Sequence, residues 1–204
     1  MRTKKTAADK YAPKKALDLG KELYEWSGTF VAAFVAVVLI LSFAAGIFTV
    51  KQSSMEPTLR EGETMLVSRL FYKPKSGDIV VFSKMGNYPG RESEYSDPAT
   101  GRERPLVKRV IAVGGDTVRI DYSANSIYVN EVKLDEDYLP DSLVMRGRGE
   151  SEYNVSPGCV FVLGDNRNNS QDSRSDWIGE IDTRYILGRL VLRIFPLNKL
   201  GIVD

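Results

Sequence analysis

The stretch GTFVAAFVAVVLILSFAAGIFTV, residues 28–50, decides how the chain is organised, because it contains no charged residue. As an α-helix its 23 residues would rise about 35 Å, enough to cross a hydrocarbon core of about 30 Å. The sequence therefore predicts one transmembrane anchor over residues 28–50. A tail, residues 1–27, precedes this anchor, and a larger part, residues 51–204, follows it.

The charges before the apolar run predict its orientation. Residues 1–50 carry seven Lys or Arg against four Asp or Glu, and Tyr24 and Trp26 lie directly before the run. Basic residues favour the cytoplasmic side and aromatic rings favour the lipid–water interface, so we expect a cytoplasmic tail, contact with membrane lipid, and an extracytoplasmic domain over 51–204. A cleaved signal peptide is the alternative, since small residues recur at 42–46. The 27-residue tail and the length of the apolar run favour an uncleaved anchor.

Two residue counts exclude whole classes of chemistry. The chain has no histidine, which excludes a Ser-His-Asp triad and any His-ligated metal. Its single cysteine, Cys159, can form neither an intramolecular disulfide nor a thiolate cluster, and we expect it to be a small buried residue of a strand. Residues 51–204 hold 21 basic and 23 acidic residues, so nothing electrostatic points to nucleic acid. We therefore expect no cofactor and no metal, and chemistry on Ser, Lys, Asp or Arg.

Beyond residue 50 the sequence alternates between apolar and polar residues and is punctuated by Gly, Asp, Asn and Pro, which is typical of strands and turns. We predict a mainly β domain built on a mixed, mostly antiparallel sheet. Two polar stretches, 85–105 and 135–157, lack the alternation and are predicted to be loop excursions. The predicted strands cover 63–69, 78–84, 106–113, 116–121, 126–129, 131–134, 159–163 and 186–194.

Lys108 is the first candidate for chemistry. In a strand it would share one face with Leu106, Val110 and Ala112, an otherwise apolar row. If that row is buried, loss of solvent lowers the pKa of the amine, and the neutral amine can take a proton from a serine hydroxyl. If the strand lies at an edge, Lys108 reaches water and has no such role. The pattern alone leaves both interpretations open.

Two further segments could meet such a lysine. The segment SSMEPTL, 53–59, begins three residues after the apolar run, and one of its serines could act there at the membrane surface. A turn capped by these serines is the simpler interpretation of this segment taken alone. The segment 164–175 is rich in donors and acceptors suited to a hydrogen-bond network, in which Asp172 and Arg174 could form an ion pair.

Together these segments resemble the bacterial type I signal peptidases, membrane-anchored proteases that use a Ser-Lys pair to remove signal peptides from exported proteins. The resemblance runs from the anchor to about residue 190 and rests on four motifs in the family's order. One such match would be weak, whereas four in order behind a single N-terminal anchor are specific. The motifs are SSMEPTL at 53–59, SGDIVVF at 76–82, KRVIAVGGD at 108–116 and LGDNRNNSQDSR at 163–174.

The resemblance implies a role for each matching residue. Ser54 looks like the nucleophile and Lys108 like the general base, while Ser170 resembles a serine that hydrogen-bonds the lysine amine. Asp172 and Arg174 look like a supporting ion pair. The remaining matches are expected to be structural, namely Asp165, Asn166 and Arg167 in the same motif and Asp78 in the SGD turn.

The resemblance also implies acyl transfer, in which an oxyanion needs hydrogen-bond donors. The backbone N–H of Ser54 is one expected donor. Family members can take a second from a hydroxyl two residues before the nucleophile, but this sequence has Gln52 there, so the second donor could be Gln52 or Ser53 or be absent. The implied substrates are secretory preproteins cut after small-x-small sites such as Ala-x-Ala. Their extended chain would pair with segments around 48–52 and 105–107.

Two other classes of function stay open at this point. Self-cleaving repressors of a related β fold also use a Ser-Lys pair, but they are cytoplasmic and carry a DNA-binding part that this chain lacks. A non-catalytic, membrane-tethered β domain that binds an extracytoplasmic partner would be preferred if Lys108 were solvated or distant from Ser54. For a peptidase without histidine, activity should rise through the alkaline range as Lys108 titrates, with no imidazole-like inflection.

Overall fold

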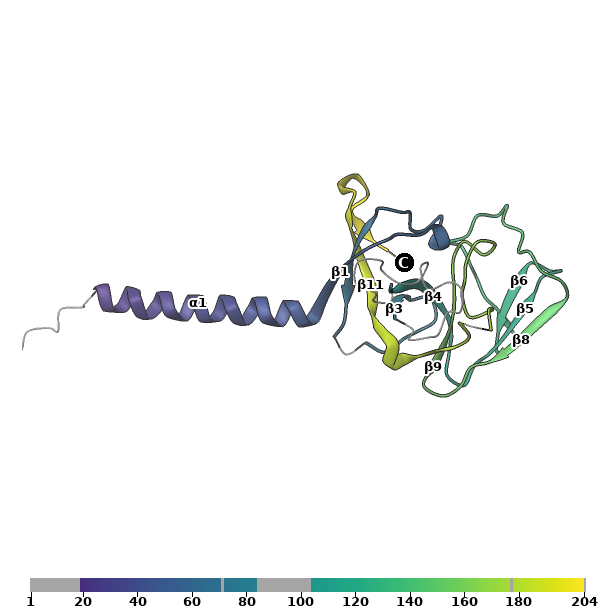
Figure 1. The fold of residues 1–204 in the computed structure, drawn as a ribbon, viewed down its shortest axis with the longest axis horizontal. Coiled ribbons are helices and arrows are strands. Elements are labelled where there is room, and N and C mark those ends of the chain that lie inside the picture. Colours follow the sequence, from purple (N-terminus) through teal and green to yellow (C-terminus); the bar gives the residue numbers. More distant parts are fainter. Residues whose placement is uncertain (1–18, 71, 84–103, 177, 204) are drawn as a thin grey trace, which may run out of the picture. The chain divides into compact units, whose positions relative to one another are not determined.

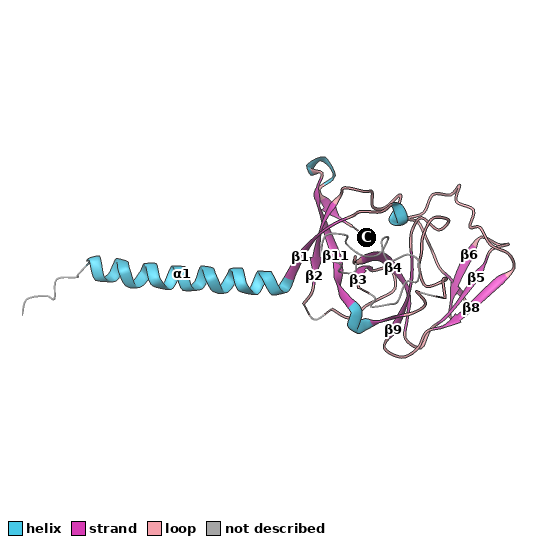
Figure 2. Cartoon of the chain, viewed as in Figure 1, coloured by secondary structure: helices cyan, strands magenta, loops and turns pink. Residues whose placement is uncertain are grey.

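A computed structural model describes residues 19–70, 72–83, 104–176 and 178–203. The chain divides into two compact units, residues 1–42 and 43–204. Helix α1, Leu19–Ala44, makes up the described part of the first unit, and antiparallel strands dominate the second (Figure 1, Figure 2). The expected loop excursion 85–105 lies outside the described residues except for its last two.

Helix α1 contains a segment that is long and apolar enough to span a membrane, Trp26–Ala44, with a mean hydropathy of 2.3. The predicted anchor extended to residue 50, but the helix ends at Ala44 and the chain continues as strand β1, Ala45–Thr49. Strand β1 pairs with β2, Thr64–Ser68, which satisfies its backbone on one side. The prediction was therefore too long at this end, because an apolar run is compatible with either a helix or a strand.

The larger sheet has eight strands in the order β1-β2-β11-β3-β4-β9-β10, with β12 paired to β11. A second sheet of four strands has the order β7-β6-β5-β8. Every strand pair in the described part of the chain is antiparallel, which confirms the mainly antiparallel β fold. The other strands are β3 Ile79–Phe82, β4 Leu106–Val113, β5 Thr117–Asp121, β6 Ser126–Val129, β7 Val132–Lys133, β8 Glu150–Asn154, β9 Cys159–Leu163, β10 Ile181–Asp182, β11 Ile186–Phe195 and β12 Gly201–Ile202.

Each of the eight predicted strands overlaps an observed one, and four strands were missed. Strands β1, β10 and β12 are short or lie in segments without alternation. Strand β8, with the sequence ESEYN, lies inside the predicted excursion 135–157. It is an outer strand of the second sheet, where it pairs only with β5 (Figure 1). A polar outer strand lacks the apolar face on which sequence-based strand prediction depends.

Strand β4 is central to the core, because its residues enter three apolar clusters. Val110 packs with residues of β3 and β9, and Val107 packs with Met55 and Leu59 of the segment after β1. Ile111 packs with the inner face of the second sheet. Neighbouring strands cover β4 on both sides, β3 along its first half and β9 along its second.

This placement decides between the two interpretations of Lys108. Lys108 is 1% exposed and Arg109 is 2% exposed, so two adjacent cations point into opposite sides of a buried strand. Burial lowers the pKa of Lys108 from 10.5 to about 8, because the ammonium loses its hydration. Below pH 8 the folded protein therefore holds a poorly solvated charge, which opposes folding.

The stability of the protein should consequently depend on pH through Lys108. Between pH 8 and 10.5 the unfolded chain binds more protons at this residue than the folded chain, so stability rises with pH in that window. We expect Lys108→Met to stabilise the protein at pH 7 by up to about 3 kcal/mol and to remove this rise. Urea unfolding in detergent at several pH values would measure it.

Lys133→Met, in the exposed strand β7, is the matched control and should leave both the stability and its pH dependence unchanged. A difference between the Lys108→Met variant and the parent that stays constant from pH 7 to about 10.5 would show that the amine is not desolvated.

Candidate active site

The candidate nucleophile, Ser54, lies on a short segment, residues 53–59, that is fixed by its own apolar residues and is called the nucleophile segment below. After β1 the chain forms a one-turn 3-10 helix, Ser53–Met55. Met55 and Leu59 are 1% and 0% exposed and pack into the cluster that also contains Val107 of β4. Burial of these two side chains holds the intervening backbone against β4, and Ser54 is left half-buried at the surface of the domain.

Lys108 reaches this serine from the neighbouring strand. Its Nζ lies 2.6 Å from Ser54 Oγ and donates a hydrogen bond of 3.1 Å to the carbonyl oxygen of Val107. Desolvation is the main cause of its lowered pKa, and the negative charges of Asp172 and Asp165 act in the opposite direction. At pH 8 about half of the lysines are thus neutral, with the amine next to the hydroxyl.

The expected ion pair of Asp172 and Arg174 is formed. Asp172 is fully buried, and its carboxylate accepts hydrogen bonds from Arg174 Nε at 2.8 Å and from the backbone N–H of Gly164 at 3.0 Å. Arg174 in turn donates to the carbonyl of Arg167 at 2.7 Å. These bonds link residues within the loop after β9. They also hold the negative charge of Asp172 near Lys108, where it partly offsets the lowering of the lysine pKa by burial.

The bond expected between Ser170 and Lys108 is not formed in this structure, where Ser170 Oγ is buried without a hydrogen-bond partner. Ser170 nevertheless lines the same cleft as Ser54 and Lys108. A side chain at Gly164 would collide with both Ser170 and the backbone carbonyl of Ser54. Glycine at this position therefore allows the loop to lie against the nucleophile segment.

Asn166 ties the loop after β9 to the nucleophile segment. Its backbone N–H donates to the carbonyl of Ser54 at 3.0 Å, and its Nδ2 donates to the carbonyl of Ser53 at 3.1 Å. Asn169 Nδ2 lies 3.3 Å from Ser53 Oγ. The two serines thus differ, since the side chain of Ser54 faces Lys108 and that of Ser53 faces an asparagine.

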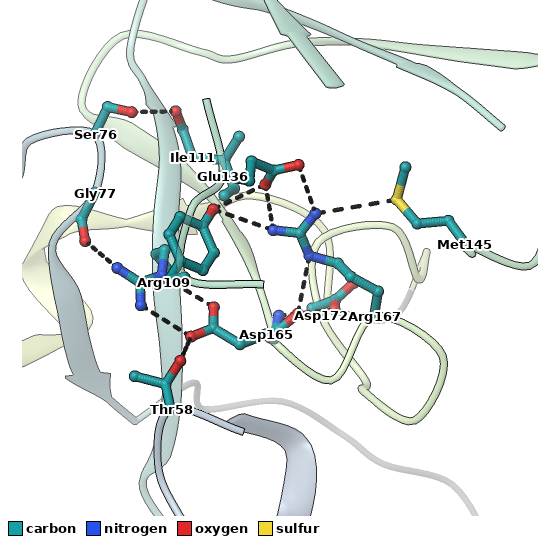
Figure 3. A network of polar contacts seen from close by, with 12 residues as sticks. Thr58, Ser76, Gly77, Arg109, Ile111, Glu136, Met145, Asp165, Arg167 and Asp172 are labelled. Carbon is teal, nitrogen blue, oxygen red and sulfur yellow. Dashed lines mark hydrogen bonds and ion pairs between the residues drawn. The ribbon is translucent and has the colours of Figure 1, made fainter. Parts of the chain in front are cut away.

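A buried salt bridge holds the other end of the nucleophile segment (Figure 3). Arg109 donates from Nε and Nη2 to the carboxylate of Asp165 at 3.0 and 2.9 Å, and from Nη1 to the carbonyl of Gly77 at 3.0 Å. The same carboxylate accepts a hydrogen bond of 2.6 Å from Thr58 Oγ1. Arg109 and Lys108 therefore act on opposite faces of β4, one in the scaffold and one in the cleft.

A second ion pair, which the sequence reasoning missed, extends this network. Arg167 pairs with Glu136 through two of its nitrogens and donates from Nε to the carbonyl of Gly164 at 3.2 Å (Figure 3). Tyr138 donates to Glu136 at 2.8 Å, and its ring centroid lies 3.8 Å from the guanidinium carbon of Arg109. Glu136 and Tyr138 lie in the predicted excursion 135–157, where nothing in the sequence distinguishes them from other polar loop residues.

Two remaining expectations concern the scaffold. Asp78 accepts hydrogen bonds from Tyr72 Oη at 2.7 Å and from Arg189 Nη1 at 3.0 Å, which supports the structural role expected for it. Cys159 was expected to be buried but is only partly buried at the start of β9. Strand β9 is covered from Val160 onward, and its first residue lies at the end of the sheet.

The cleft at Ser54 has a volume of about 420 Å³ and is mostly polar. Across the described ranges no cluster of three or more His, Cys, Asp or Glu is arranged to hold a metal ion. The cleft presents three serine hydroxyls, the Lys108 amine with its lowered pKa, the Glu61 carboxylate and several side-chain amides. Its lining residues are Gln52, Ser53, Ser54, Glu61, Leu106, Lys108, Asn168, Asn169, Ser170 and Gln171.

Comparison with known proteins places this chain in a family. Residues 23–195 match the family described as signal peptidase, peptidase S26. The chain is 33% identical over 197 residues to signal peptidase IB of Staphylococcus aureus, covering 88% of this chain and 93% of the relative. It is 31% identical over 195 residues to a probable signal peptidase I-2 of Synechocystis, covering 92% of this chain and 77% of the relative.

Among solved structures, the chain is similar to a signal peptidase I from Enterococcus faecalis, with 26% identity and a TM-score of 0.42, covering 59% of this chain and 98% of that one. Since this TM-score is low, the assignment depends on the sequence matches, which span nearly the whole chain. The chain belongs to the signal peptidase family S26 and is a type I signal peptidase, a serine protease.

Proposed function

We propose that this signal peptidase cuts preproteins with Ser54 as nucleophile and Lys108 as general base. The observation that supports this most directly is the 2.6 Å separation of Lys108 Nζ and Ser54 Oγ, with the lysine 1% exposed. Burial supplies the neutral amine that a lysine base requires near pH 8. A non-catalytic binding domain would have no need for a desolvated amine beside a serine in an open cleft.

The reaction proceeds by acyl transfer. Neutral Lys108 takes the proton of Ser54 Oγ, and the oxygen attacks the carbonyl carbon of the scissile peptide bond. The C–N bond then breaks, and the Lys108 ammonium gives its proton to the leaving amine. A water molecule, deprotonated by Lys108, attacks the resulting ester; the C–O bond to Ser54 breaks, and the proton returns to Ser54 Oγ.

The oxyanion of the tetrahedral intermediate requires preorganised donors. The backbone N–H of Ser54 is the first proposed donor, and the side-chain amide of Gln52, which lines the same cleft, is the second. Ser170 remains the proposed partner of the Lys108 amine. Its buried and unpartnered Oγ supports this, because a small rearrangement on substrate binding would satisfy the hydroxyl.

The free edges of the sheet support binding of an extended peptide. In β4, residues 106–108 pair with β3 on one side, whereas β9 begins to pair with β4 only at Arg109. Among the described residues, no strand pairs with 106–108 on the side where β9 later pairs, which leaves room for a substrate strand, and Gln52 of the segment 48–52 lines the same cleft. Side chains at positions −1 and −3 of the substrate would share one side of the extended chain and point into the cleft, and we propose small residues there, as in Ala-x-Ala-like sites.

This mechanism predicts different outcomes for three variants in detergent. Ser54→Ala and Lys108→Ala should each reduce cleavage of a preprotein with an Ala-x-Ala site by at least about 10³-fold, since each removes a member of the reacting pair. Ser53→Ala is the matched control, because its hydroxyl faces Asn169, and it should keep most of the activity. Product formation followed by mass spectrometry would test this, and normal cleavage by Lys108→Ala would refute the mechanism.

We also propose that the β domain works on the extracytoplasmic side, in contact with lipid. Four residues form an apolar row across strands β1, β2, β11 and β12 on one sheet face, since directly paired residues share a face. The two ends of the row are 72% and 78% exposed, and β1 follows the membrane span directly in the chain. Lipid would cover this surface at no desolvation cost. The row consists of Ile47, Leu66, Leu192 and Ile202.

The orientation can be tested with single cysteines in intact cells. After Cys159→Ser removes the native thiol, Val132→Cys places a new thiol at a position that is 70% exposed. A membrane-impermeant maleimide added outside should label it. The matched variant Cys159→Ser with Lys10→Cys, in the basic tail, should be labelled only after permeabilisation. The reverse pattern would place the catalytic domain in the cytoplasm.

A further inference from the structure

The active-site cleft carries one charged side chain that the proposed mechanism does not use. Of the described residues that line the cleft, only Lys108 and Glu61 are ionisable at physiological pH. Lys108 lies in the buried strand β4, whereas Glu61 is exposed. When Lys108 is in its neutral, reactive form, the carboxylate of Glu61 is the remaining charge among the described residues of the cleft, and it is negative.

The backbone at Glu61 is firmly held. Gly62 donates to the carbonyl of Val50 at 2.9 Å, and Val50 donates back to the carbonyl of Glu63 at 2.9 Å. Glu63 is buried and forms ion pairs with Arg193 and Lys199, each at 3.1 Å. The turn that presents Glu61 is therefore fixed on both sides, next to the segment that carries Ser54.

The carboxylate of Glu61 is free to interact with a ligand. Within the described residues it forms no hydrogen bond and no ion pair, in contrast to Glu63 two residues later. Arg60, which precedes it in the chain, and Lys51, which follows the hydrogen-bonded Val50, are exposed and do not line the cleft. The charges that act on Lys108 come from Asp172, Asp165 and Arg174 and do not include Glu61. Glu61 is thus placed to act on the substrate and not on the base.

We infer that Glu61 gives this peptidase a preference for substrates with a basic side chain beside the scissile bond, and disfavours acidic ones. The inference rests on the proposed function of the cleft. Under the proposed function, positions −1 and −3 take small residues, which leaves −2, +1 and +2 for a charged side chain near the cut. In an extended substrate, +2 points to the same side as −1 and −3, and −2 and +1 point to the opposite side. A carboxylate at the rim of an open cleft attracts Lys or Arg through a screened interaction.

The test compares peptides of one parent sequence with Ala at −1 and −3 and neutral residues elsewhere. Six derivatives carry Lys or Asp at −2, +1 or +2, and the full chain in detergent cleaves each of them. At one or more of these positions, kcat/KM should be about 2- to 5-fold higher for Lys than for Asp at low salt. The ratio should fall towards one at about 0.5 M NaCl, because salt screens exposed charges.

Three variants identify the source of the preference. Glu61→Gln should bring the Lys-to-Asp ratio to about one, Glu61→Lys should invert it, and Glu61→Asp should keep it. Each ratio is taken within one variant, so a change in that variant's overall rate does not alter it. Glu152→Gln, an exposed glutamate of β8 on the second sheet, is the matched control and should keep the ratio of the unmodified protein.

A ratio near one in the unmodified protein, or a preference that persists in Glu61→Gln, would overturn the inference while leaving the peptidase intact. Failure of the unmodified protein to cut even the neutral parent would instead overturn the proposed function, and the inference with it. The neutral parent peptide keeps these two failures apart, since it has no charged side chain beside the cut for Glu61 to attract or repel.

Discussion

The burial of one lysine amine in β4 is the constraint on which the rest of the active site depends. Desolvation lowers the pKa of Lys108, while the carboxylates of Asp172 and Asp165 raise it. With the opposing charges close by, the pKa settles near 8 and not lower. If those carboxylates had no cationic partners, they would hold the lysine protonated. Their pairing with Arg174 and Arg109 weakens that effect.

Ser54, the partner of Lys108, is held in position by contacts from distant parts of the chain. Asn166 bonds to the backbone of Ser53 and Ser54, and the carboxylate of Asp165 bonds to Thr58 and Arg109 (Figure 3). The adjacent residues Asp165 and Asn166 thus hold both ends of the nucleophile segment. This explains why polar residues are concentrated after β9, where a hydrophobic residue could fill space but could not fix the position of a backbone carbonyl.

Those features of the fold and the active site that depend on a local sequence pattern could be predicted from the sequence. The bounds of β4, β6 and β9 were predicted as observed, because alternation or a short apolar run between turn residues marks them. Four motifs in order identified the family and nominated Ser54 and Lys108. The burial of Lys108 could not be predicted, because it depends on β3, β9 and the second sheet, which come from separate parts of the chain.

The remaining misses also have physical reasons. Strand β1 was included in the anchor, because apolar residues suit a lipid-facing helix and a strand equally well. The partnership of Arg167 with Glu136 joins residues 31 positions apart, and no local pattern marks such a pair. The lack of a hydrogen-bond partner for Ser170 Oγ depends on how the side chains of the loop are placed, which the spacing of residues in the sequence does not determine.

If catalysis depends on the neutral amine of Lys108, the pH dependence of kcat/KM for a neutral peptide should follow the titration of that amine. This quantity reports the ionisation of the free enzyme. We expect kcat/KM to rise with pH and to level off, with a midpoint at about 8. A midpoint near the ordinary lysine value of 10.5, or a rate independent of pH across this range, would contradict it.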